Sequence, residues 1–178
     1  SRGFSALGPV LFELSEWPQE EISRSGEGQL LVFDRDSGEV VPMIVTLSSV
    51  ANPEREFRQK SPVIIAWPRS RFDFSGRYIA VLLRNQLHTR SSGGEQVFNP
   101  SAGMKKILDG DGSFFVKNAY APILDVIDEA GIDRDNIISL TYFSVRPESE
   151  VTTPVPLMIQ RALGQSGFVQ NVHQRSSL

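Results

Sequence analysis

Residues 118–145, NAYAPILDVIDEAGIDRDNIISLTYFSV, decide the fold class, because a helix pattern, a stop signal and a strand pattern follow one another there. The first part places a stripe of apolar and aromatic residues on one helix face: Tyr120, Ile123, Leu124, Ile127 and Ala130. Gly131 then stands where a residue with positive φ ends a helix, and Pro122 suits a first helical turn. The apolar run at 137–145 is typical of a buried strand. We therefore predict one helix over about residues 119–130, followed by a long strand.

Five other apolar runs precede this stretch, and turn-forming residues such as Gly, Pro, Asp and Ser separate them. They span residues 8–14, 29–33, 40–47, 62–67 and 77–83. Short strands separated by turns are typical of a β-sandwich, whereas a doubly wound α/β sheet needs a helix between most of its strands. The sequence therefore predicts a mainly β fold. We expect an Ig-like β-sandwich with one inserted α-helix, at about residues 119–130, before the last core strand.

Local patterns add four expectations. The run at 62–67 has no polar side chain after Pro62, which predicts a strand buried on both faces or one that lies in a sandwich core. Ser101 suits the N-cap of a short helix over 101–108. The segment 85–100, which contains Ser-Ser-Gly-Gly, indicates a long loop. The Pro- and Thr-rich segment 146–156 indicates a strand exit or a linker.

The length of 178 residues fits one domain with a tail. We expect the Ig-like domain and its inserted helix to span residues 1–147. Residues 148–178 would form a linker, a short helix ending at Gly164 and a polar C-terminal tail.

Composition excludes several classes of function. The net charge of −3 and the pI near 5.4 argue against nucleic acid, which requires a basic face. No apolar run is long enough to span a bilayer, so we expect no transmembrane segment. The first ten residues lack the apolar core of a signal peptide. The chain has no cysteine, which excludes disulfides, thiolate zinc sites and a Cys nucleophile.

The sequence offers no convincing catalytic centre. The segment 164–167, Gly-Gln-Ser-Gly, is similar to a nucleophile elbow around Ser166, but Phe168 stands where the last Gly of G-x-S-x-G belongs. The only histidines are His88, in a predicted loop, and His173, in the predicted tail. We therefore predict no catalytic residue and no cofactor within these residues.

One acidic turn has the composition of a calcium loop. Asp34, Asp36 and Glu39 lie in the sequence DRDSGE, but Val45 occupies the place of the bidentate Glu of an EF-hand. Asp and Gly also serve ordinary turns between strands, so we favour a turn and keep these three residues as weak calcium candidates. The segment 109–112, DGDG, has the same two interpretations.

Other polar and aromatic residues have a structural interpretation beside a functional one. Asp125, Asp128 and Glu129 lie opposite the apolar helix stripe and are expected on a solvated face. Seven aromatic residues fall in predicted loops or turns: Trp17, Phe57, Phe72, Phe74, Phe98, Phe114 and Phe115. We expect most of them to cover the ends of the sandwich and some to bind a partner or ligand.

Five segments together resemble the N-terminal region of a family of exported bacterial lipases, esterases and α/β-hydrolase-like proteins. The segments are GFSALGPVLFEL at 3–14, LLVFDRDSGEVVPMIV at 30–45, IIAWPRSRFDFSGRYIAVLLRNQ at 64–86, KILDGD at 106–111 and YAPILDVIDEAGIDRDNIISLTYFSV at 120–145. The order and spacing of these segments carry the resemblance. The chain departs from the family pattern at 141–144, where it reads Thr-Tyr-Phe-Ser and the family would have Trp-Asp-Phe-Thr.

The resemblance implies a non-catalytic accessory or substrate-presenting β-sandwich module of an exported carboxyl-ester hydrolase. The module would be periplasmic, outer-membrane-associated or secreted. The catalytic residues would lie in a downstream hydrolase domain, which would be its partner in cis. The alternative is a standalone binding or adhesion module for polysaccharide, a lipid surface or protein, and the loop aromatics favour it.

Overall fold

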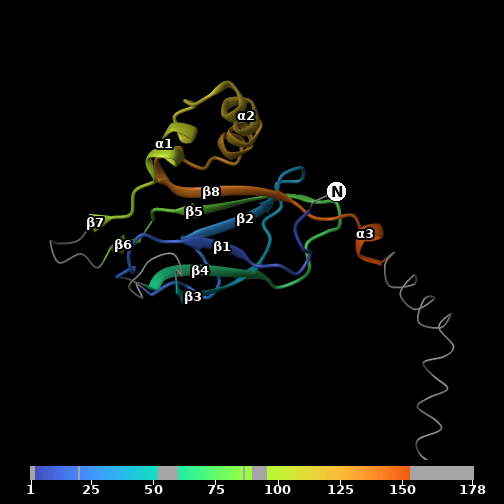
Figure 1. Cartoon of the computed structure of the whole chain (residues 1–178), viewed down its shortest axis with the longest axis horizontal. Coiled ribbons are helices and arrows are strands. Elements are labelled where there is room, and N and C mark those ends of the chain that lie inside the picture. Colours follow the sequence, from blue (N-terminus) through green and yellow to red (C-terminus); the bar gives the residue numbers. More distant parts are fainter. Residues whose placement is uncertain (1–2, 20, 52–59, 86, 90–95, 153–178) are drawn as a thin grey trace, which may run out of the picture.

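The computed structural model describes residues 3–19, 21–51, 60–85, 87–89 and 96–152. Two antiparallel β-sheets pack face to face, and a layer of helices covers the outer face of one of them (Figure 1). This β-rich, sandwich-like architecture confirms the coarse fold prediction. No described helix is long and apolar enough to cross a membrane.

Each of the two larger sheets has three strands. The first sheet has the order β1 (Val10–Glu13), β4 (Lys60–Pro68), β3 (Met43–Ala51). The second has the order β2 (Leu30–Asp34), β5 (Arg77–Leu83), β8 (Ile137–Ser144). The six predicted strands are therefore confirmed. A small hairpin, β6 (His88–Thr89) and β7 (Gln96–Val97), lies in the predicted loop and was not foreseen.

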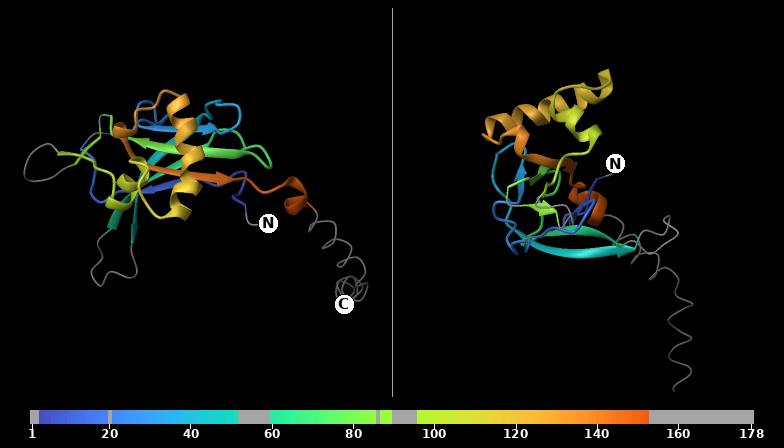
Figure 2. Two further views of the ribbon diagram at one scale, coloured as in Figure 1. Left: turned by 90° about the horizontal axis from the view of Figure 1, so that it is seen from above. Right: turned by 90° about the vertical axis from the view of Figure 1, so that its left-hand side faces the viewer.

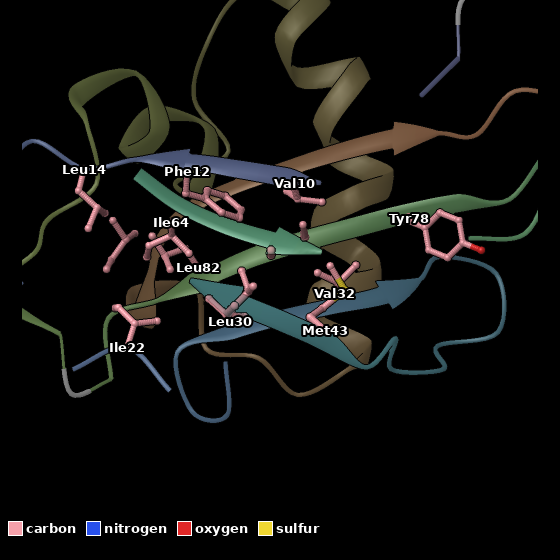
Figure 3. Close-up of a cluster of buried hydrophobic side chains, with 14 of the residues drawn as sticks. Val10, Phe12, Leu14, Ile22, Leu30, Val32, Met43, Ile64, Tyr78 and Leu82 are labelled. Carbon is pink, nitrogen blue, oxygen red and sulfur yellow. The ribbon is translucent and has the colours of Figure 1, made fainter. Parts of the chain in front are cut away.

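The main core lies between the two sheets (Figure 3). Val32, Val45, Ile64 and Leu82 are each at most 1% exposed and come from β2, β3, β4 and β5. At one end of this core an aromatic group is built from Phe4, Phe72, Tyr78 and Phe143. The Phe72 ring lies 4.6 Å from that of Tyr78 and 5.3 Å from that of Phe143. The inner face of the β2-β5-β8 sheet is thus packed against the β1-β4-β3 sheet.

A second core lies between the β2-β5-β8 sheet and the helices. β5 alternates between the two cores: Tyr78, Ala80 and Leu82 face the first sheet, while Ile79, Val81 and Leu83 face the helices. All six side chains are buried. β5 is therefore the strand that is buried on both faces, whereas β4 has its Trp67 side chain 45% exposed and fits the sandwich-core alternative.

The helix layer consists of α1 (Ala102–Leu108) and α2 (Phe114–Glu129), and the 3-10 helix η1 (Arg134–Asn136) follows them. The Ser101 side chain caps α1 by accepting a hydrogen bond from the Met104 backbone N–H, as predicted. α2 ends as predicted at Gly131, whose φ is +70°. The backbone N–H groups of Gly131 and Ile132 donate to the carbonyls of Asp128 and Ile127, which forms a Schellman motif.

The predicted start of the main helix was wrong. α2 begins at Phe114, not near residue 119, because Ser113 accepts a hydrogen bond from the Val116 N–H and caps it there. Pro122 consequently lies inside the helix and not in its first turn. The apolar stripe could not reveal this start, since Phe114 and Phe115 point to solvent. The segment predicted as a strand exit or linker also contains a short helix, α3 (Glu148–Thr152).

Candidate ligand-binding sites

A cleft lies where α1, the end of α2, η1 and the start of β8 meet. Its volume is about 930 Å³, and we call it the helix cleft. Its lining is mixed, with Arg84, Asn99, Pro100, Lys105, Leu108, Asp109, Asp128, Gly131, Ile132, Asp133, Arg134, Asp135 and Ile137. A cleft of this size is large enough for a small organic ligand.

Arg134 joins the two helices on one wall of the helix cleft. Its Nε donates to Asp128 Oδ1 at 2.8 Å, and its Nη1 donates to the Leu108 carbonyl at 3.2 Å. The hydrogen bond from Arg134 holds the pKa of the Asp128 carboxyl below its usual value, and the Asp128 carboxylate raises the pKa of Arg134. Both groups therefore stay charged at neutral pH, and Arg134 links η1 to the C-terminal ends of α1 and α2.

Arg84 contributes an unpaired donor to the helix cleft. Its backbone N–H donates to the Asn136 carbonyl at 2.7 Å, which places it beside η1. Its Nε is buried and has no hydrogen-bond partner in the part of the chain that the structure describes. A buried donor without an acceptor is costly, so this nitrogen marks a place where an acceptor would stabilise the protein.

Two carboxylates of the helix cleft are also without ion pairs. Within the described ranges, no basic side chain pairs with Asp133 or Asp135. Asp133 instead accepts a hydrogen bond from the Asp135 backbone N–H at 3.0 Å and caps η1. By contrast, Lys105 pairs with Asp109 at 3.0 Å. The helix cleft thus offers a cation and two anions that other side chains do not neutralise.

The acidic turn after β2 has the geometry of an Asx turn. Asp34 Oδ1 accepts hydrogen bonds from the Asp36 and Ser37 backbone N–H groups at 2.8 Å each. Arg77 Nε donates to Asp36 Oδ2 at 3.1 Å. In the described segments, no three acidic or histidine side chains stand close enough to hold a metal ion. The turn geometry is therefore explained without a metal, and calcium binding by Asp34, Asp36 and Glu39 stays a prediction.

The same turn forms one wall of a smaller cleft, of about 450 Å³. Tyr78 lines this cleft and accepts a hydrogen bond from the Asp73 backbone N–H at 2.8 Å. Burial raises the pKa of the Tyr78 hydroxyl. This tyrosine is therefore neutral at physiological pH and serves to hold the turn before β5.

Among the described residues, the most exposed aromatic side chains are those of Phe114 and Phe115, which we call the Phe pair. Their side chains are 73% and 83% exposed, and their rings meet edge to face at 6.0 Å. They are the first two residues of α2, directly after its cap Ser113. This end of α2 stands farther from the sheets than its other end does (Figure 2, right). The Phe pair thus exposes two apolar side chains at the N-terminal end of α2.

The remaining loop aromatics divide between core and surface. Phe72 and Phe98 are buried, Phe74 is partly buried against the sandwich core, and Trp17 is 44% exposed. Phe57 lies outside the described residues. Three of the six described loop aromatics pack in or against the core, and the other three, Trp17 and the Phe pair, are exposed, so the expectation that most of them cover the ends of the sandwich is not confirmed.

The residues considered for catalysis are not brought together. Ser166 and His173 lie outside the described residues, and His88 lies in β6. Asp125, Asp128 and Glu129 are exposed, as predicted for the outer face of α2. Sequence reasoning missed Arg84, although a basic residue directly after the apolar run 79–83 could have indicated a charge held at a strand end.

Comparisons of the chain with models of known protein families, with curated proteins and with solved structures found no match.

Proposed function

We propose that this chain is a non-catalytic module that attaches an exported bacterial carboxyl-ester hydrolase to an apolar ester substrate through the Phe pair. The observation that carries the proposal is the exposure of Phe114 and Phe115, at 73% and 83%. Large apolar side chains that lie together on a surface are typical of interaction sites. Burial of each phenyl ring in an apolar phase would contribute about 1.5–3 kcal/mol.

The charges beside the Phe pair favour a neutral partner. Lys117 lies 3.9 Å from Asp111, so the basic side chain closest in sequence is balanced by an acid. An anionic membrane would instead select an excess of Lys and Arg around the aromatic residues. Neutral ester droplets, such as a triglyceride emulsion, therefore fit this surface better than an anionic bilayer.

The association with a hydrolase and the bacterial, exported setting rest on the resemblance of segments 3–14, 30–45, 64–86, 106–111 and 120–145. The two antiparallel sheets support the Ig-like interpretation as a packed sandwich. The strand order differs from that of a constant-type Ig domain, because β1 and β2 lie in opposite sheets here, whereas the first two strands of such a domain share one sheet.

Flotation with a trioctanoin emulsion tests the role of the Phe pair. We expect the wild-type chain to float with the droplets and the F114S/F115S variant to bind at least about tenfold more weakly, since the loss of two buried rings exceeds 1.4 kcal/mol. Leu11→Ser is the matched control, because Leu11 is also exposed, at 58%, but lies on β1. Equal flotation of wild type and F114S/F115S contradicts the proposal.

A second experiment separates the accessory module from its alternatives. A coding sequence in which a G-x-S-x-G domain follows this chain supports the hydrolase module, whereas a stop codon directly after Leu178 favours a standalone binding module. Residues 1–178 should not hydrolyse a short-chain p-nitrophenyl ester above the buffer rate. Hydrolysis that Ser166→Ala abolishes would instead establish a catalytic site in this chain.

A further inference from the structure

The helix cleft has a charge pattern that no part of the proposed function uses. It lies beside the C-terminal end of α2, whereas the Phe pair lies at the N-terminal end. Three basic and four acidic side chains line it, so the lining carries one net negative charge. Arg134 pairs with Asp128 and Lys105 pairs with Asp109. The charges that stay available are those of Arg84, Asp133 and Asp135.

We infer that the helix cleft binds a small ligand of the amino-acid type, with the ligand carboxylate on Arg84 and its ammonium groups on Asp133 and Asp135. The guanidinium of Arg84 is planar and matches a carboxylate with two parallel hydrogen bonds. Arg84 lines the helix cleft and has no ion pair among the described residues, and the ligand carboxylate would supply one.

The net negative charge of the helix cleft disfavours a purely anionic ligand. A phosphate dianion would add two negative charges to a lining that is already net negative, and like charges at short range repel. A ligand with one carboxylate and two ammonium groups carries one net positive charge and neutralises the lining. Lysine has this charge pattern. The C-terminal lysine of a peptide keeps the carboxylate and the side-chain ammonium, but its α-nitrogen is an uncharged amide.

The wall that carries these groups is held rigidly. Arg134 ties the carbonyl of Leu108, at the end of α1, to Asp128 of α2. Asp133 caps η1, and the Arg84 backbone bonds to Asn136 at the end of η1. The backbone that carries Arg84 and η1 is therefore held by main-chain hydrogen bonds before a ligand arrives, and the Asp133 carboxylate is held by the Asp135 N–H, which reduces the entropy that binding costs.

Titration of the ¹⁵N-labelled chain with lysine, followed by NMR, tests the inference. The Nε–Hε signal of Arg84, assigned by its loss in Arg84→Gln, should shift together with the amide signals of 133–136. Arg84→Gln should weaken binding roughly tenfold or more, because a charge-assisted pair is lost. Arg69→Gln, at an exposed arginine outside the helix cleft, should leave the affinity unchanged.

Matched ligands identify the chemistry that is recognised. Cadaverine, which is lysine without its carboxylate, should bind at least about tenfold more weakly if Arg84 holds the carboxylate. The tripeptide Gly-Gly-Lys and its C-terminal amide distinguish a free amino acid from a peptide end as the source of the carboxylate. Gly-Gly-Lys that binds more tightly than lysine, with this binding lost in the amide, supports a peptide end, and lysine that binds more tightly than Gly-Gly-Lys supports a free amino acid.

Several outcomes overturn the inference: no shift with lysine at tens of millimolar, equal affinity for cadaverine, or tighter binding of inorganic phosphate. Where Arg84→Gln does not fold, Asp135→Asn at the exposed end of η1 serves instead and should also weaken lysine binding. Unchanged lysine affinity of a folded Arg84→Gln or Asp135→Asn variant overturns it as well.

Discussion

The two sheets of this molecule differ in what covers their outer faces. The outer face of β2-β5-β8 lies under α1 and α2, and Ile79 on that face is 0% exposed. The outer face of β1-β4-β3 has no such layer among the described residues, and Ile44 on that face is 45% exposed. The two isoleucines therefore differ in their surroundings: Ile79 packs against the helix layer, whereas Ile44 is partly exposed to solvent.

This difference explains the position of the Phe pair. α2 is held on the sheet by Ile123, Leu124 and Ile127, which lie in its C-terminal half. Its first turn extends beyond these contacts and carries Phe114 and Phe115 into solvent. The covered sheet thus carries the helix that exposes the Phe pair. The uncovered outer face of β1-β4-β3, which we call the bare sheet, has exposed apolar side chains of its own, among them Ile44 and Trp67.

The largest expected effect separates the two outer faces directly. Ile79→Ala should lower the free energy of unfolding by about 3–4 kcal/mol, because it leaves a cavity between β5 and the helices. Ile44→Ala, the same change on the bare face, should cost less than about 1 kcal/mol. Urea denaturation of both variants measures the contrast. Equal losses would mean that the helices do not cover β5.

A medium effect concerns the end of the helix layer. Gly131→Ala should destabilise the chain by about 1–2 kcal/mol, because Gly131 has a φ of +70° that disfavours a Cβ atom. No atom lies within 4 Å of the added Cβ, so the cost is one of backbone conformation. Gly103→Ala, inside α1 with equally open space, should instead stabilise by about 0.5–1 kcal/mol. Thermal unfolding shows whether the two changes have opposite signs.

The sequence predicts the elements that this comparison involves, but it does not predict which sheet face the helices cover. Alternation in 77–83 and the Gly131 stop place β5 and the end of α2 correctly, since local periodicity and backbone conformation determine both. Which face the helix covers depends on contacts between distant residues, such as Ile79 with the α2 stripe, and no local pattern records them.

The candidate sites were harder to predict than the fold. Phe114 and Phe115 belong to the set of aromatic residues in predicted loops or turns. The sequence does not distinguish exposed from buried members of this set, as Phe115 and Phe72 show. Arg84 and Asp135 are far apart in sequence and meet only because β5 and β8 pair. The cleft that they share therefore could not be derived from spacing alone.

The smallest expected effect is the pH dependence of the Asp128–Arg134 pair. The Asp128 pKa is lower in the folded chain than its ordinary value of 3.8, so the pair stabilises the fold above that pH. This contribution is lost as the pH falls through the lower, folded pKa. Both groups are partly exposed, so Asp128→Asn should cost less than about 1 kcal/mol at pH 7.

A double-mutant cycle measures this coupling. The effects of Asp128→Asn and Arg134→Gln should be less than additive at pH 7 and should approach additivity below pH 3.8. Coupling that persists unchanged in acid would mean that the carboxylate charge of Asp128 is not what couples it to Arg134.

Tryptophan fluorescence tests most directly whether the helix end or the bare sheet meets an apolar surface. The chain has two tryptophans, Trp17 and Trp67. In a Trp17→Phe variant, Trp67 reports on the bare sheet, and in a W17F/W67F/F115W variant the indole at position 115 reports on the helix end. With trioctanoin droplets, we expect a blue shift and protection from an aqueous quencher for the indole at position 115 alone. A blue shift of Trp67 with an unchanged signal from position 115 would contradict this expectation.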